Sequence, residues 1–153
     1  MQIINFGNEK AGLVLLQIAG QQEAAMIEQE YGLIREKSDK DFLLTAVMAD
    51  NWNDDLSPWA AEPVFGREDF GGRADDFLKQ LAVLTDQLRP AGSAIRLYIG
   101  GYSLAGLFAL WSVTRTDRFD GAAAVSPSVW FDGFTDYLMN NSVRCNAVYL
   151  SLG

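Results

Sequence analysis

The sequence predicts an α/β fold, a three-layer α/β/α sandwich on a mostly parallel sheet. Apolar runs of strand length alternate along the chain with amphipathic segments of helical length. Of the 153 residues, 49% are hydrophobic and 21% are charged, a composition that suits one domain, residues 1–153, with a sizeable core. Strands that alternate with helices give right-handed crossovers, so we expect an open sheet covered by helices on both faces.

The N-terminal third contains two predicted strands and one predicted helix. The apolar run Leu13–Ile18 is typical of a buried parallel strand. We expect a helix over Gln22–Tyr31, ended by Gly32. A second buried strand is expected at Phe42–Met48. The stretch 49–69 that follows is irregular and rich in proline and aromatic residues, and long loops of this kind in compact domains are usually functional.

The rest of the chain continues the alternation. Apolar residues recur at steps of three and four from Phe70 to Leu88, which predicts an amphipathic helix packed on the sheet. Ile95–Gly100 is a predicted strand, and a buried helix is expected after Ser103, running to about Thr114. The last predicted elements are a small-residue strand at Gly121–Ser126, a helix around Phe134–Asn140 and a strand at Asn146–Leu152.

A sharp turn at Ser103 is the most informative local feature. Residues 95–106 read I-R-L-Y-I-G-G-Y-S-L-A-G. A serine on a tight strand-to-helix bend takes a strained backbone conformation so that its hydroxyl projects above the sheet. The positions two before and two after it face the crowded crossing of strand and helix, and here they are the small residues Gly101 and Ala105. We therefore predict a positive φ at Ser103 and a nucleophilic role for its hydroxyl.

Two other interpretations of this segment stay open. In the first, Gly100-Gly101 only ends a strand and Ser103 is a helix cap. A phosphate-binding glycine loop is the second alternative, but G-G-x-S-x-x-G lacks both the G-x-G-x-x-G spacing and the lysine of a P-loop. The formal net charge of −8 also disfavours a polyanionic ligand.

The chain has no histidine, which bears directly on a serine nucleophile. A serine hydroxyl attacks efficiently only when a base takes its proton, and in the Ser-His-Asp arrangement that base is an imidazole. The sequence thus offers a nucleophile position without its usual partner.

Composition limits the remaining partners and cofactors. An acidic chain without a basic cluster predicts no nucleic-acid partner, and the short apolar run near the N-terminus predicts neither a signal peptide nor a membrane span. A single cysteine, Cys145, fits a reducing compartment, so we expect a cytoplasmic protein. Without histidine or C-x-x-C, no metal site is expected.

Strand order sets the position of the expected crevice. In open α/β sheets it lies at the carboxyl ends of the strands, where the strand order reverses. If the first predicted strand lies between the second and third, Gln21 sits beside the Ser103 turn. The backbone N–H groups of Gln21 and Leu104 then form a two-donor oxyanion hole. A plain turn after the strand explains Gly20 equally well.

Two motifs resemble a known family. G-G-Y-S-L-A-G-L-F-A-L-W and, at 117–131, D-R-F-D-G-A-A-A-V-S-P-S-V-W-F resemble the esterase D-like and enterochelin-esterase-like branch of the α/β-hydrolase superfamily. The resemblance covers residues 95–131 best and the whole chain more loosely. It implies an α/β-hydrolase-like fold and cofactor-free cleavage of small-molecule carboxylic esters. It also implies that Ser103 is the nucleophile and that Leu104 and Gln21 are the oxyanion donors.

The chain departs from the family pattern at its end. In such enzymes the acid follows the strand after the S-P-S segment, and the histidine comes later. Here the corresponding strand is followed at once by Gly153. The resemblance therefore implies a C-terminally incomplete domain, without the final strand and helix, in which the acid and the histidine of the triad are absent.

Several other residues are candidates with plainer explanations. Trp52, Asn53 and Trp130 are candidates for the substrate pocket, although aromatic residues more often belong to a core. Asp132 is a candidate acid that more often acts as a helix cap. We expect Ser126 and Ser128, on either side of Pro127, to shape a turn.

These observations predict a serine ester hydrolase whose nucleophile is Ser103 and which is inactive or nearly so as this chain alone. The alternative is a non-catalytic module that keeps the fold for binding or assembly. An apolar strand left at the sheet edge also predicts a homo-oligomer, because exposed edges recruit partners.

Overall fold

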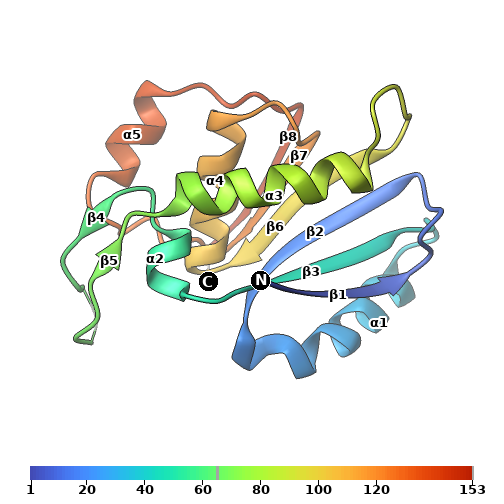
Figure 1. Cartoon of the computed structure of the whole chain (residues 1–153), viewed down its shortest axis with the longest axis horizontal. Coiled ribbons are helices and arrows are strands. Elements are labelled where there is room, and N and C mark those ends of the chain that lie inside the picture. The colour runs from blue at the N-terminus through green and yellow to red at the C-terminus, as the bar shows by residue number, and fades with distance from the viewer. Residues whose placement is uncertain (65, 153) are drawn as a thin grey trace.

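The computed structural model describes residues 1–64 and 66–152. Figure 1 shows a twisted sheet with α3 and α4 across one face and α1 on the other. The predicted three-layer sandwich with a mostly parallel sheet is confirmed. The sheet consists of β1 (Gln2–Gly7), β2 (Leu13–Gly20), β3 (Leu43–Ala49), β6 (Arg96–Tyr102), β7 (Gly121–Val125) and β8 (Ala147–Ser151), in the order β1-β3-β2-β6-β7-β8.

The helices connect these strands. They are a 3-10 helix at Gln21–Met26, α1 (Ile27–Lys37), α2 (Trp52–Leu56), α3 (Ala74–Leu88), α4 (Leu104–Arg115) and α5 (Phe134–Asn140). A separate two-stranded ribbon pairs β4 (Ala60–Ala61) with β5 (Phe70–Gly71). Most predicted strands and helices lie within a few residues of the observed bounds.

Strand pairing agrees with the expected topology at the centre of the sheet. β2 lies between β3 and β6 and pairs with both in parallel. The first strand, β1, is antiparallel to β3 and was not predicted. Its alternating exposed and half-buried residues give an edge strand a much weaker signal than a buried apolar run.

Helix α4 is the centre of the larger core. All residues from Leu104 to Thr114 are buried, where they pack with α2, α3 and the inner face of the sheet. The smaller core, on the opposite face, lies between α1 and strands β2 and β3, with Phe42 and Met48 at its centre. Both faces of the sheet thus pack against helices, and on the α1 face the helix covers mainly β2 and β3.

Two predicted helix boundaries were wrong. Gly32 does not end its helix, because α1 continues to Lys37 and Ile34 packs on the smaller core. Phe70 does not begin α3. It is buried in β5, and the helix starts at Ala74. In both cases a tertiary contact, which the local pattern does not contain, decides the boundary.

The helix layer on the α1 face does not cover every strand. On this face, Tyr102 is 57% exposed and Tyr149 is 61% exposed. On the other face, Val148 and Leu150 of edge strand β8, whose strand partners are the core residues Ala122 and Ala124, are also exposed. Within residues 1–64 and 66–152, no helix has the length and apolar character needed to cross a bilayer.

Candidate functional site

The carboxyl ends of the parallel strands meet at one edge of the sheet. Gly20 pairs with Ala49, Ile18 pairs with Gly101, and Tyr102 pairs with Val125. The chain passes from β2 to β3 on one side and later to β6 on the other, so the strand order reverses between β2 and β6. Ligand crevices of open α/β sheets lie at such a point, and the Ser103 turn stands beside it.

The strained turn predicted at Ser103 is confirmed. Ser103 has φ 57° and ψ −119° and directly precedes α4. A non-glycine residue in this region is conformationally strained, and such strain gathers at functional sites. Its side chain is half-buried rather than fully exposed. The predicted position, at the carboxyl edge between β6 and α4, is the observed one.

Small residues make this turn possible. A β-carbon at Gly101 would lie 2.5 Å from that of Ala105. One at Gly106 would lie 3.0 Å from the Gly101 carbonyl oxygen and 3.2 Å from that of Val125. The strand, the turn and the helix therefore approach as closely as glycine allows. Ala105, a departure from G-x-S-x-G, fits because Gly101 has no side chain.

The loop after β7 is hydrogen-bonded to the same turn. The Ser103 N–H donates to the Val125 carbonyl at 3.0 Å, and the Ser128 N–H donates to the Ser103 carbonyl at 3.0 Å. The two hydroxyl oxygens of Ser103 and Ser128 are 3.1 Å apart. The sequence predicted only a turn-shaping role for Ser128. Its spacing from Ser103 carries no signal of this contact, because the two residues meet only through the β6–β7 pairing.

The two expected oxyanion donors follow the ends of the paired strands β2 and β6. Gln21 is the first residue of the 3-10 helix that follows β2, and Leu104 is the first residue of α4. Backbone N–H groups in a first helical turn have no partner within the helix. Gly20, the last residue of β2, donates its N–H to the Glu23 carboxylate at 2.6 Å, which fixes the start of this helix.

Trp52 and Asn53 line one cavity near the carboxyl end of β3. The cavity has a volume of about 380 Å³, and its described lining residues are Asp50, Asn51, Trp52, Asn53, Asp54, Glu68 and Asp69. Trp52 also packs against the larger core. The Asn53 amide faces the carbonyl oxygens of Glu68 and Asp69, at 3.4 and 3.5 Å. Neither Ser103 nor Trp130 is among the residues that line this cavity.

Trp130 lies on the loop before α5 and is 45% exposed. Its ring centre is 6.3 Å from that of Phe70 in β5. Trp59 is instead surrounded by aromatic rings of the core, and its indole N–H donates to the Asp132 carbonyl at 3.0 Å. The N-cap of α5 is Gly133 rather than Asp132, so the expected capping role of Asp132 was wrong.

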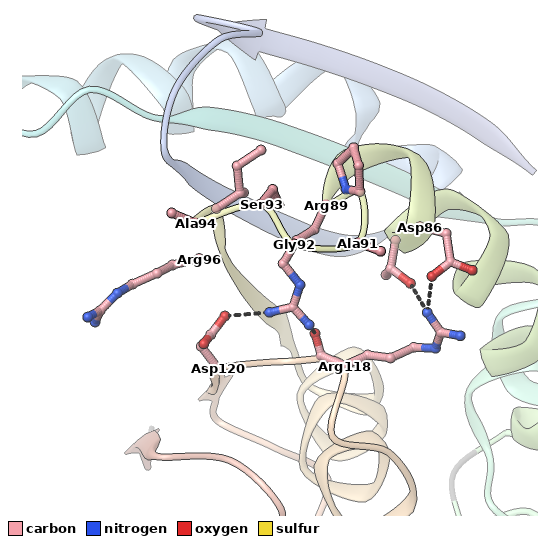
Figure 2. Close-up of a pocket in the computed structure, with 12 residues that line it drawn as sticks. Asp86, Arg89, Ala91, Gly92, Ser93, Ala94, Arg96, Arg118 and Asp120 are labelled. Carbon is pink, nitrogen blue, oxygen red and sulfur yellow. Dashed lines mark hydrogen bonds and ion pairs between the residues drawn. The ribbon is translucent and has the colours of Figure 1, made fainter.

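A second polar cavity lies at the opposite end of the parallel strands, beside the amino ends of β6 and β7 (Figure 2). Its volume is about 480 Å³. Arg89 donates to the Asp120 carboxylate at 2.8 Å, and the same carboxylate accepts the Leu97 N–H at 2.8 Å. Arg118 is paired with Asp86. These two ion pairs fasten the end of α3 to the sheet, and Arg96 adds a third positive side chain to the lining of the cavity.

No imidazole is available to the site, because the chain lacks histidine. Among the described residues, no group of three or more histidine, cysteine, aspartate or glutamate side chains is placed to hold a metal ion. Four acidic residues, Asp50, Asp54, Glu68 and Asp69, line the cavity around Trp52.

Comparison with known proteins supports the fold. No family model and no curated protein sequence matches the chain. Among solved structures, the siderophore hydrolase EstA from Aspergillus nidulans is similar, with a TM-score of 0.65 and 21% identity over 95% of this chain and 58% of its own. An IroE-like serine hydrolase from Shewanella oneidensis has a TM-score of 0.66 and 20% identity, over 90% of this chain and 49% of its own.

A third similar structure, the siderophore hydrolase EstB from Aspergillus nidulans, has a TM-score of 0.56 and 22% identity, over 82% of this chain and 48% of its own. The expected α/β-hydrolase-like fold is confirmed. The chain spans only about half the length of these three structures.

Proposed function

We propose that Ser103 is the nucleophile of a serine hydrolase that cleaves carboxylic esters of small molecules. The observation that carries the proposal is its strained conformation, φ 57° and ψ −119°, at the strand-to-helix turn of an α/β-hydrolase-like fold. A tight strand-to-helix turn that raises a serine above the sheet is the arrangement by which α/β-hydrolases present their nucleophile. A helix cap does not require such strain, because ordinary cap residues have unstrained extended backbones.

The reaction follows from these groups. The Ser103 oxygen attacks the ester carbonyl carbon, and its proton passes to a base. The backbone N–H groups of Leu104 and Gln21 donate to the oxyanion that develops on the carbonyl oxygen. The alcohol then leaves with a proton from the same base, and water cleaves the acyl-serine ester, which regenerates the hydroxyl.

The base and its carboxylate partner are proposed to lie outside these 153 residues. The chain has no histidine, and it spans about half of the similar hydrolases. Without a base, catalysis falls to what the oxyanion donors and binding supply, roughly 10³–10⁴ over water. As this chain alone, the protein is expected to show trace hydrolysis at most.

The substrate is proposed to lie over the carboxyl edge of the sheet, between Trp52 and Asn53 at the start of α2 and Trp130. Support comes from the position of both segments on that edge and from the aromatic surface of Trp130, which is 45% exposed. Aromatic walls with a few polar groups are typical of small-molecule sites.

We also propose that the chain forms a homo-oligomer through β8. This strand is at the sheet edge, and its exposed residues include Tyr149 at 61% and Leu150 at 52%. An unpaired apolar edge is a template for pairing with a second copy.

Ester hydrolysis by two chains tests the proposal. The 153-residue protein and a version extended by the segment encoded downstream are compared on p-nitrophenyl acetate and on a panel that includes siderophore esters. Activity is expected to rise by orders of magnitude in the extended chain, provided that the segment holds an acid and a histidine, and to vanish with Ser103→Ala. A folded, histidine-bearing extension that hydrolyses no ester contradicts the proposal and favours the non-catalytic binding module.

A further inference from the structure

Ser128 contacts Ser103 through both its backbone and its side chain. Its N–H donates to the Ser103 carbonyl at 3.0 Å, and its hydroxyl oxygen is 3.1 Å from that of Ser103. The Ser103 N–H is held by Val125 at 3.0 Å. The loop after β7 therefore fixes the peptide groups on either side of the strained residue and touches its reactive oxygen.

The two hydroxyl groups differ in their access to water. Ser128 is 1% exposed, whereas Ser103 is half-buried. Within residues 1–64 and 66–152, the hydrogen-bond partner of Ser128 Oγ is Ser103 Oγ. The distance alone leaves either oxygen as the donor.

Burial decides the direction of this hydrogen bond. If Ser103 donates, the hydrogen of the buried Ser128 hydroxyl has no acceptor, and an unsatisfied buried donor is costly. If Ser128 donates, its hydrogen is satisfied, and Ser103 keeps its own hydrogen free for water or a base at the open edge of the sheet. The second arrangement satisfies both groups.

We propose that Ser128 is a positioning residue that donates a hydrogen bond to Ser103 Oγ and stabilises the negative charge that this oxygen gains as it loses its proton. This inference rests on the proposed nucleophilic role of Ser103. Hydrogen bonds to charged groups are stronger than those between neutral groups, so the Ser128 contact strengthens as Ser103 becomes anionic. Ser128 keeps its own proton throughout and forms no bond with the substrate.

Reaction with a fluorophosphonate isolates this step in the chain as it exists. The Ser103 oxygen forms a bond to phosphorus, the phosphorus–fluorine bond breaks, fluoride leaves, and the serine proton passes to water or hydroxide. No histidine is needed for the slow reaction, so its rate reports on Ser103 itself. Intact-mass spectrometry gives the rate, and peptide mapping gives the labelled residue.

Variants at position 128 distinguish the effect of the Ser128 hydroxyl on the labelling rate from the effect of side-chain packing. Ser128→Ala removes the donor and keeps the backbone N–H. Ser128→Thr and Ser128→Val form a second pair of nearly equal shape that differs in the hydroxyl. Ser126→Ala makes the same chemical change in the same loop, at a side chain outside this contact. Circular dichroism and thermal unfolding establish the folded fraction, to which each rate is normalised.

We expect Ser128→Ala to label at Ser103 about tenfold or more slowly than the unmodified chain, the loss of one hydrogen bond to a charged oxygen. Threonine is expected to label faster than valine at position 128 by a similar factor, and Ser126→Ala to label like the unmodified chain. Equal rates in the serine and alanine forms, or in the threonine and valine forms, overturn the role of Ser128 and leave Ser103 as nucleophile. No labelling of Ser103 in the unmodified chain overturns both proposals.

Discussion

Gly101 and Ala105 are in the closest contact that their backbones allow. A β-carbon built on Gly101 would lie 2.5 Å from the Ala105 β-carbon and 2.8 Å from its carbonyl carbon. Both distances are far below van der Waals contact, and the second neighbour is backbone that cannot turn aside. The crossing of β6 and α4 therefore requires glycine at position 101, and this crossing presents Ser103.

Gly101→Ala is expected to destabilise the protein by about 2–3 kcal/mol, the usual cost of overpacking a rigid contact. Gly12→Ala is the matched control, because a β-carbon at Gly12 meets no atom within 4 Å. Urea unfolding followed by circular dichroism measures both. Equal midpoints for the two variants would show that β6 and α4 leave room for a β-carbon at position 101.

The strain at Ser103 predicts an inverted order of stability. At an ordinary position alanine is more stable than glycine, but at φ 57° a β-carbon is strained and glycine is not. Ser103→Gly is therefore expected to be more stable than Ser103→Ala by about 1–2 kcal/mol. Both variants lack the hydroxyl, so the comparison isolates the backbone. Thermal unfolding tests it, and an alanine variant that is the more stable of the two would be incompatible with a strained turn.

Asp120 is expected to contribute more to stability than other paired carboxylates on the surface. It accepts hydrogen bonds from Arg89 and from the Leu97 N–H, both at 2.8 Å. Asp120→Ala leaves two donors without this partner, and a loss of about 1–3 kcal/mol is expected in urea unfolding. Asp76→Ala, which removes an exposed pair with Lys79 and a carboxylate in the first turn of α3, is the control and is expected to change the midpoint much less. Similar midpoints for both variants would show that the hydrogen bonds of Asp120 with Arg89 and the Leu97 N–H do not stabilise the fold more than an exposed ion pair does.

Edge strand β8 predicts self-association at micromolar concentrations. Sedimentation equilibrium is expected to show dimers or larger species, and Leu150→Lys to shift them toward monomer, since charged side chains discourage edge pairing. Leu150 is 52% exposed, so a lysine at this position can extend its charged end into solvent. A monomer across the whole concentration range would refute association through this edge.

The elements that the sequence predicted well are those with strong local patterns. The buried strands Leu13–Gly20 and Leu43–Ala49 are nearly continuous apolar runs, and α3 and α4 have clear apolar faces. The missed elements lack such a pattern. β1 is an edge strand of alternating character, and the ribbon of β4 and β5 consists of two-residue strands that depend on tertiary pairing.

The site could be predicted only where it is local in sequence. The turn at Ser103 depends on residues within three positions of it, so the motif was sufficient. Ser128 is 25 residues away, and its contact exists only because β6 pairs with β7. The positions of Trp52 and Trp130 likewise depend on how α2 and the loop before α5 pack, which no spacing along the chain encodes.

The most direct test of the central claim is the site at which a fluorophosphonate labels the 153-residue chain. The protein is incubated with the probe for hours near neutral pH, digested, and mapped by tandem mass spectrometry, with Ser103→Ala treated in parallel. The account predicts slow, single-site labelling at Ser103 in folded protein and none in the alanine variant or after unfolding in urea. Labelling spread over several serines, or equal labelling in Ser103→Ala, would contradict a nucleophilic role for Ser103.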